Sequence, residues 1–577
     1  MTVSAIRTSG PSPVFLQLNS NSELKENNMK FNNNFNSALT ASLVLSMLLF
    51  TACQDESFLD TENLNQPDQV RALGSPSDVE ALVRGAAVSY FAAHDYGGYE
   101  HLLVSSDVMS CSWGNAMMKL SSSEPRVAIP NTTSYTYSYA VENNWYRMYR
   151  AISSANDGLN ALADGMQVGD GGADNKRMET FAKLIQGMAH GLLACFYDQA
   201  FIYDETVDLA TDVLELKPYS EVMAAAISQL EAAAALADAN SFTMDGWWNG
   251  ITQTNEDVSK LAHSFIARYL AQVARTPAER TAVSWSSVKN HVSKGITETF
   301  APHGDGYNNW VHSGQEFHND RGGSWARMDY KFIGGADASD GYKDWLATDV
   351  QLRAEFIMDI SDKRVAAGNV TFAEKQETGY KDDAEEEGLY AGTRGGSPFR
   401  ANRGTYHFSR YSFHRYAGFA SGGYTDPIPI MTLAEMDMLR AEAELHAGNG
   451  DAAAAIIDKY HADLGGYPSS VGTAVGSISD VMGPIDGPVS DGTLWAMLKY
   501  NKMMEIALSG AGVEFYDIRG WGDLTKNTAY DHPVPAKELG VLQLELYSFG
   551  GCATADCHGA PGNPKTPREY YGPHVPR

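Results

Sequence analysis

The stretch Asn144–Leu162, NWYRMYRAISSANDGLNAL, decides the fold. Its large apolar residues recur at helical spacing, so that Trp145, Tyr149, Ile152 and Leu159 fall on one face. A helix with one apolar face must cover that face with another element. The stretch therefore predicts an amphipathic helix that has a packing partner.

The partner follows after a turn at Gly169–Ala173. Apolar residues again repeat at intervals of three or four, at Phe181, Leu184, Met188, Leu192 and Phe196. Two amphipathic helices joined by a short turn are typical of a helical hairpin.

Further pairs of the same kind extend along the chain. The predicted helices are Val222–Ala233, Val258–Tyr269, Pro427–Gly448, Asp451–His461 and Leu494–Leu508. Tandem helix pairs favour a mostly α fold with tetratricopeptide-like hairpins, although no consensus repeat can be recognised. We expect a helix fraction well above the usual third of residues.

Residues Phe300–Gly423 have a different character. Helical periodicity fades, while Gly, Tyr, Trp, Asn and Asp become frequent, as in GDGYNNWVHSGQEFHNDRGGSW (Gly304–Trp325). A loop segment of this length inside a folded chain is usually functional. We therefore predict a loop-rich, ligand-facing side.

The segment Met29–Glu56 has the layout of a secretory signal. Lys30 is followed by an apolar run, Ala38–Phe50, and then by small residues before Cys53. The run is too short to span a bilayer comfortably, which takes about 20 residues. Cys53 resembles the lipidated cysteine of a bacterial lipobox. Several acyl chains, such as palmitate, would anchor the chain, since each buried CH₂ contributes about 0.8 kcal/mol.

These features divide the chain into four parts. Residues 1–28 are interpreted as a start-site extension and residues 29–52 as the lipoprotein signal peptide. Residues 53–299 and 300–577 are predicted to be the N-terminal helical part and the loop-rich, C-terminal helical part of one domain.

The composition excludes one class of partner. The net charge is −28, which opposes binding to phosphate backbones, so we expect no nucleic acid.

Cys195 lies in a helical pattern and is predicted to be a buried thiol. With Cys53 lipidated, Cys111, Cys195, Cys552 and Cys557 allow three disulfide pairings, with Cys552–Cys557 our first choice.

Four stretches of the chain resemble the SusD/RagB family of nutrient-binding lipoproteins. They are Trp145–Leu159, Phe181–Tyr203, Pro429–Gly448 and Met503–Gly522. The last resembles the end of the family pattern, with Glu505, Gly510, Phe515, Asp517, Arg519, Trp521 and Gly522 in order, and His532–Leu539 resembles a late segment of the family. The acidic–arginine pair that the family tends to have is missing around Tyr500–Lys502. We interpret Asp517 and Arg519 as a structural ion pair at a helix end.

The resemblance implies a function and a cellular location. A family member would be a SusD-like binding protein, lipid-anchored at the outer membrane and facing outward. It would deliver oligosaccharide to a SusC-like TonB-dependent transporter. Peptide is the alternative ligand, because part of the family binds peptides.

The candidate ligand-binding residues are aromatic and polar side chains in non-helical stretches. Flat rings match the C–H faces of sugars, and amides and carboxylates bind the hydroxyl groups. The candidates are Asp107, Trp113, Asn115, Trp247, Trp248, Trp310, Trp325, Arg327 and Tyr330.

No motif of catalysis is present in the sequence. It lacks H-E-x-x-H, G-x-x-x-x-G-K-[ST] and G-x-S-x-G, so we predict neither an enzyme nor a cofactor. The loop histidines have no standard ligand spacing, and no metal is predicted; they are His303, His312, His318, His407 and His414. A glycoside-acting enzyme remains the alternative from another class, because its two carboxylates leave no signature in sequence.

Overall fold

The structure is a computed structural model that describes residues 73–317, 326–365, 388–393, 411–482 and 489–551, with residues 373 and 409. All of them belong to one unit of the chain, Gln69–Arg577. The signal segment, Cys53, Cys552, Cys557 and Trp325 lie outside the described residues. About 51% of the described residues are helical, so the prediction of a mostly α fold is confirmed.

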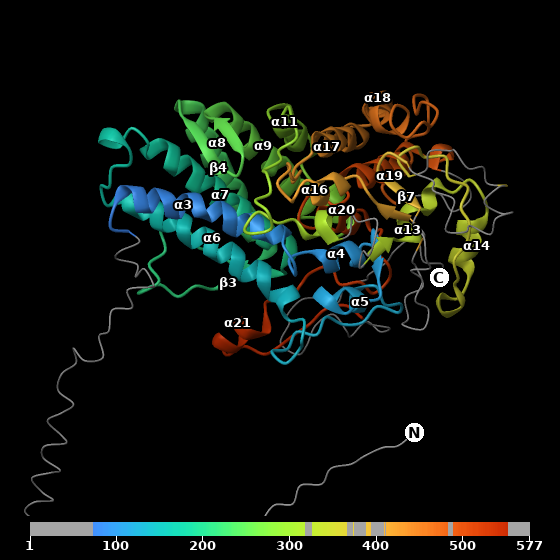
Figure 1. Ribbon diagram of the computed structural model, residues 1–577, viewed down its shortest axis with the longest axis horizontal. Helices are drawn as coiled ribbons and strands as arrows, with labels where there is room; N and C mark the ends of the chain where they lie inside the picture. Colours follow the sequence, from blue (N-terminus) through green and yellow to red (C-terminus); the bar gives the residue numbers. More distant parts are fainter. Residues whose placement is uncertain are drawn as a thin grey trace, which may run out of the picture. The chain divides into compact units, whose positions relative to one another are not determined.

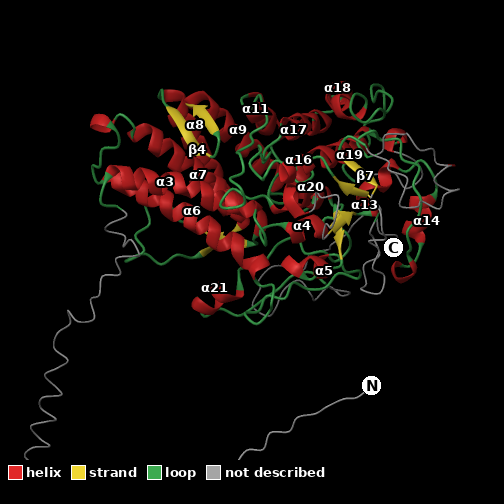
Figure 2. Ribbon diagram, in the orientation of Figure 1, coloured by secondary structure: helices red, strands yellow, loops and turns green. Residues whose placement is uncertain are grey.

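Helices alternate with loops along the whole unit (Figures 1 and 2). The first nine are α3 (Pro76–Phe91), α4 (Glu100–Ser105), α5 (Met118–Ser121), α6 (Tyr139–Ala163), α7 (Asn175–Phe196), α8 (Tyr219–Ala239), α9 (Asn255–Gln272), α10 (Pro277–Thr281) and α11 (Trp285–Ser293). The others are α12 (Ser313–Phe317), α13 (Tyr330–Ile333), α14 (Gly341–Ala347), α16 (Ala417–Ser421), α17 (Leu433–His446), α18 (Gly450–His461), α19 (Leu494–Ile506), α20 (Val513–Trp521) and α21 (Ala536–Val541).

The strands are short and form antiparallel pairs. They are β1 (Met109–Cys111) with β6 (Ala326–Met328), β2 (Gln199–Phe201) with β3 (Leu216–Pro218), β4 (Thr243–Trp248) with β5 (Ile251–Thr254), and β7 (Ala391–Thr393) with β8 (Tyr411–Phe413). Two of these pairs, β1 with β6 and β7 with β8, contain strands from the loop-rich half, and the other two lie beside the helical hairpins. Buried residues of the strands, such as Met109 and Trp248, belong to the core.

The long helices pack in chain order as a row of hairpins, as expected for a tetratricopeptide-like arrangement. α3 packs on α6, α6 on α7, α7 on α8 and α8 on α9, and the row continues through α11 to α17, α18 and α19. The predicted apolar face of α7 is buried along its length, from Phe181 to Phe196. A capping box of Thr254 and Asp257 fixes the start of α9.

Of the helices in the described residues, only α8 is long and apolar enough to cross a membrane. It lies between α7 and α9, and its residues Val222, Ala226, Leu230 and Ala233 are buried there. Packing within the hairpin row therefore accounts for its apolar character.

A network of buried ions ties the C-terminal helices to α10. Arg280 pairs with Glu442 of α17 at 2.7 Å and with Asp517 of α20 at 2.9 Å, and Lys502 of α19 lies 2.8 Å from Asp517. Arg519 instead donates to the backbone oxygens of Cys195, Gln272 and Tyr530. The prediction of an ion pair between Asp517 and Arg519 is wrong, because each side chain has a partner from a distant part of the chain.

Candidate functional site

The pairing of β1 with β6 brings two predicted stretches together. Ser110 lies opposite Arg327 and Cys111 opposite Ala326, so Asp107–Asn115 runs beside the end of the Tyr307–Tyr330 stretch. Trp113 follows β1 directly and is 51% exposed, the largest exposure of any tryptophan in the described residues. About half of the indole surface is in contact with solvent and is therefore available for contact with a ligand.

The backbone around Trp113 forms a tight loop. The Lys119 N–H donates to the Trp113 carbonyl at 2.8 Å, and the Ser122 hydroxyl donates to the Cys111 carbonyl at 2.9 Å. Ala116 and Met117 have left-handed φ angles of 46° and 64°. Such strain in residues other than glycine is found most often at functional sites, where the surrounding structure maintains it.

Half-buried tyrosines surround the loop. The Tyr139 hydroxyl accepts the Ala116 N–H at 3.0 Å and lies 2.8 Å from the Tyr96 hydroxyl. Tyr137 is so close to Gly114 that a Cβ at that position would lie 3.0 Å from the phenol oxygen. We call Tyr96, Trp113, Asn115, Tyr137 and Tyr139 the aromatic platform; its members other than Trp113 are half-exposed.

Asp107 holds this loop in place through buried contacts. It is 4% exposed, its carboxylate lies 2.7 Å from Arg126, and it accepts the Thr525 hydroxyl at 2.5 Å. Lys331 completes the group by pairing with Glu124 and approaching Asp107 at 3.4 Å. Because these contacts occupy the carboxylate, Asp107 positions the loop and does not face solvent.

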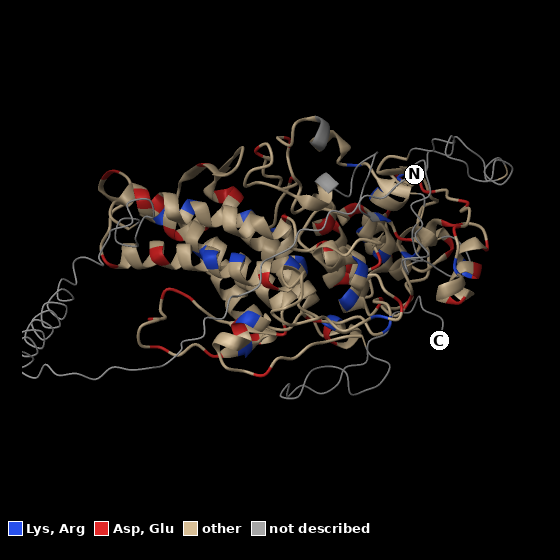
Figure 3. Cartoon of the chain, turned by 60° about the horizontal axis from the view of Figure 1, so that its bottom comes forward, with Lys and Arg blue, Asp and Glu red and all other residues tan. Residues whose placement is uncertain are grey.

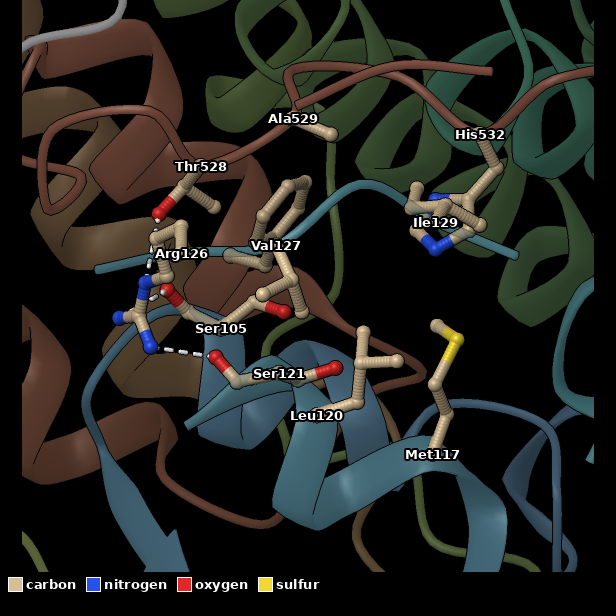
Figure 4. A pocket seen from close by; sticks show the side chains of 11 residues that line it. Ser105, Met117, Leu120, Ser121, Arg126, Val127, Ile129, Thr528, Ala529 and His532 are labelled. Carbon is tan, nitrogen blue, oxygen red and sulfur yellow. Dashed lines mark hydrogen bonds between the residues drawn. The ribbon is translucent and has the colours of Figure 1, made fainter. Parts of the chain in front are cut away.

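A small cavity lies beside the same loop (Figure 4). It has a volume of about 30 Å³ and is lined by Arg126 and Thr528 at one end, by His532 at the other, and by Met117 and Leu120 between them. Arg126 donates from Nε to the Thr528 hydroxyl at 2.9 Å. This volume holds one or two water molecules, so the cavity is too small for a sugar.

The other predicted tryptophans form a second cluster. The Trp248 and Trp310 rings lie 6.0 Å apart, and Trp248 packs edge-on against Phe300 at 5.3 Å. Trp248 is 1% exposed and is a core residue, whereas Trp247 and Trp310 line a pocket of about 440 Å³ beside α3. This cluster is built on β4 and the His303–Trp310 loop, apart from the elements of the aromatic platform.

The family model described as the SusD family matches residues 306–540 of this chain. Over these residues, which are less than half of the 577-residue chain, the protein is similar to the SusD family.

Solved structures of the SusD superfamily resemble this chain in fold. A SusD superfamily protein from Bacteroides vulgatus is 14% identical, with 81% of this chain and 97% of that chain covered at a TM-score of 0.51. A SusD homolog from Bacteroides thetaiotaomicron is 13% identical, with 79% and 89% covered at a TM-score of 0.50. No curated protein matches the chain. At such identities the likeness concerns the fold alone.

The remaining predicted residues are placed as follows. Arg327 and Asn115 are half-buried beside the Trp113 loop. Tyr330 is 1% exposed, stacks on Phe356 at 4.4 Å and donates to the Phe356 carbonyl at 3.2 Å. Cys195 is a buried free thiol, as predicted, and Cys111 is also free and buried.

Sequence reasoning missed the tyrosines of the platform. The run SYTYSYA (Ser134–Ala140) places an aromatic ring at every second position, and this alternation is the signal that could have revealed them. It fell partly inside a Ser/Thr-rich stretch that composition alone identifies as a surface loop.

The described histidines do not form a metal cluster. His312 is buried, with Nε2 2.9 Å from the Ser509 carbonyl and Nδ1 3.1 Å from the Tyr99 hydroxyl. Burial lowers the pKa of His312 to about 4, so the ring is neutral at physiological pH. Within the described ranges no three His, Cys, Asp or Glu side chains are grouped to hold an ion. His318 and His407 lie outside those ranges.

Proposed function

We propose that this protein is a cell-surface lipoprotein of the SusD family that captures an oligosaccharide and delivers it to a SusC-like TonB-dependent transporter. Its role is binding and not catalysis. The aromatic platform is the proposed binding surface, with Trp113 as the main contact. Asp107 and Arg327 hold the loop and its neighbouring strand in position.

The exposure of Trp113 carries this proposal. A ring that is 51% exposed, on a strained loop and next to half-exposed tyrosines, offers flat apolar area to the C–H face of a sugar. Tyr and Trp supply such area with few rotors to immobilise. The Asn115 amide beside them can donate to and accept from sugar hydroxyls.

The binding experiment compares Trp113→Ala with Leu209→Ala on a glycan array and in a peptide-mixture pull-down. Leu209 is 60% exposed and lies outside the platform. We expect weak glycan binding, reduced at least tenfold by Trp113→Ala and unchanged by Leu209→Ala, with helicity equal in both. Trp310→Ala and Trp325→Ala, tested in parallel, show whether the other tryptophans contribute. Binding that survives Trp113→Ala contradicts the platform, and a hit among peptides alone contradicts the sugar ligand.

The lipid anchor is tested by Cys53→Ala. We expect the wild-type chain to carry acyl chains on Cys53 and to fractionate with the outer membrane. The variant should become soluble outside the cytoplasm or retain its signal peptide. Normal maturation of Cys53→Ala together with full membrane association would contradict lipidation at this residue.

The transporter partner is tested by co-purification from membranes in mild detergent. In this proposal the ligand is imported by a partner that spans the outer membrane. We expect a large β-barrel protein to co-purify with the tagged wild-type chain. A clean monomer in several detergents counts against the pairing.

A further inference from the structure

The pocket beside α3 has features of a binding site distinct from the aromatic platform. Its volume is about 440 Å³, within the range of small-ligand pockets, and it lies where α3 packs beside β4 (Figure 1). Arg84 and Gly85 of α3 line one side, and Trp247, Asn249 and Trp310 line the other. The two sides come from helix, strand and loop, so the pocket is a product of the tertiary fold.

The free hydrogen-bonding groups of this pocket are mainly donors. Trp247 is 5% and Trp310 8% exposed, and neither indole N–H donates a hydrogen bond within the described residues. Neither nitrogen is fully enclosed, in contrast to that of Trp248. A ligand acceptor in the pocket would therefore satisfy groups that the protein leaves unpaired.

Arg84 adds the positive charge. Its side chain is exposed and has no carboxylate partner among the residues that the structure describes. One guanidinium nitrogen lies 3.9 Å from where a Cβ on Gly246 would stand, so the charge lies beside β4. Arg177 nearby is already paired with Glu80 and with Asp174 at 3.1 Å. Arg84 is thus the cation that remains for a ligand.

Asn249 provides a fixed acceptor. Its amide nitrogen donates to the carbonyls of His303 at 2.9 Å and Gly304 at 3.0 Å. These bonds leave its side-chain oxygen for a hydroxyl donor. The same bonds fasten the loop that carries Trp310 onto the β4–β5 turn.

A smaller hollow of about 300 Å³ adjoins the pocket and shares Arg84 and Trp247 with it. It adds Ser77, Thr243 and Asp245, which suit hydroxyl groups, and the ion pair of Glu80 with Arg177. Together the two hollows have a donor-rich part at Arg84 and a part where hydroxyl and carboxylate side chains can bind the hydroxyl groups of a second sugar.

We propose that this pocket binds an acidic oligosaccharide, with the carboxylate of one sugar on Arg84 and the indole N–H groups and the next sugar in the adjoining hollow. The inference rests on the proposed function in that the ligand is a saccharide. A carboxylate needs such a local cation here, because the chain has a net charge of −28 and acidic side chains outnumber basic ones over the described helices and loops (Figure 3).

The test uses trigalacturonate and its methyl ester, which lacks the carboxylate charges and carries one added methyl group per sugar, with calorimetry at low salt. Wild type should bind the acid at least tenfold more tightly than the ester. Arg84→Gln should remove that preference, and Arg440→Gln, which removes an exposed charge on α17, should retain it. Equal binding of acid and ester to wild type, or an unchanged preference in Arg84→Gln, overturns the proposal.

A filling variant tests the cavity itself. A Cβ on Gly85 meets nothing within 4 Å, so Gly85→Leu should extend into the pocket without unfolding α3 and should weaken binding of acid at least tenfold. Gly540→Leu, at an equally open position on α21, is its control. Trigalacturonate binding that is unchanged in Gly85→Leu contradicts the location.

Trp113→Ala separates this inference from the proposed function. It should leave trigalacturonate binding intact. If Trp113→Ala abolishes that binding while Arg84→Gln does not, the acidic sugar binds at the platform, and only the second site is wrong. Binding of an acidic peptide without binding of trigalacturonate overturns the sugar ligand of this pocket.

Discussion

Glu514 is completely buried on α20, where its Oε1 accepts the Leu508 N–H at 2.7 Å. Its other oxygen has no hydrogen-bond partner among the described residues. Burial is the main cause that raises the pKa of Glu514 to about 8, and the nearby charges of Glu435 and Asp517 act in the same direction. The side chain is therefore protonated in the folded protein at neutral pH.

This pKa predicts how stability depends on pH. The folded state holds a proton that the unfolded state releases near pH 4.5, so Glu514 lowers the free energy of unfolding as pH rises from about 4.5 to about 8. Glu514→Gln should remove this loss and raise the Tm at pH 8 more than at pH 5. Exposed Glu298→Gln is the control, and thermal unfolding followed by circular dichroism is the measurement. An equal change in Tm at both pH values would mean that the Glu514 carboxyl is already ionised in the folded protein at pH 5, which contradicts the raised pKa.

At the scale of elements, two glycines allow α7 to approach its neighbours closely. A Cβ at Gly187 would lie 2.5 Å from the Leu230 side chain and 2.9 Å from the Ala226 carbonyl of α8. At Gly191 it would lie 2.1 Å from the ring of Tyr269 on α9. Glycine lowers helix propensity, so its presence here is explained by the packing of the hairpin row.

We predict opposite effects for two glycine-to-alanine changes. Gly187→Ala should destabilise the protein by about 1–3 kcal/mol, because backbone of α8 blocks the new methyl group. Gly85→Ala on α3, which meets nothing within 4 Å, should stabilise it by about 0.5–1 kcal/mol through helix propensity. Urea unfolding of both variants measures the difference. Stabilisation by Gly187→Ala would mean that α7 and α8 are farther apart than described.

At the scale of the whole molecule, Glu442 joins parts of the chain that are far apart in sequence. It accepts Arg280 of α10 through both oxygens at 2.8 and 2.7 Å and the Trp521 indole N–H at 2.9 Å. Burial alone raises the pKa of this carboxyl, but Arg280 and Lys502 outweigh burial and hold the pKa at about 2. The hairpin row and the C-terminal helices are thereby fixed to each other.

Removing the charge of Glu442 should lower the free energy of unfolding of the whole unit. Glu442→Gln leaves Arg280 with one fewer buried counter-charge and should cost about 3–5 kcal/mol, whereas exposed Arg440→Gln on the same helix should cost under about 0.5 kcal/mol. Since the folded pKa is depressed, the stability due to Glu442 is present above about pH 4.5 and is lost as pH falls towards 2. Denaturant unfolding at pH 7 and pH 3 checks both effects; a variant as stable as wild type at pH 7 contradicts them.

The sequence by itself determined the helices, because helical periodicity is a local property. The spacing of Phe181, Leu184 and Met188 follows from 3.6 residues per turn, and it identifies the buried face of α7 without reference to any other element. The apolar run before Cys53 is equally local. In the same way, a helix pair separated by a short turn leaves few alternatives to a hairpin.

Only the tertiary structure decided which aromatic residues are exposed to solvent. Trp113 and Trp248 occupy similar mixed stretches in sequence, yet one is 51% and the other 1% exposed, because Phe300 and Trp310 cover Trp248 from distant parts of the chain. Asp107 accepts a hydrogen bond from Thr525, which is 418 residues away in the sequence. Asp517 accepts one from Arg280, which is 237 residues away. Burial and ion pairing depend on contacts between residues far apart in the chain, and side-chain spacing carries no information about those contacts.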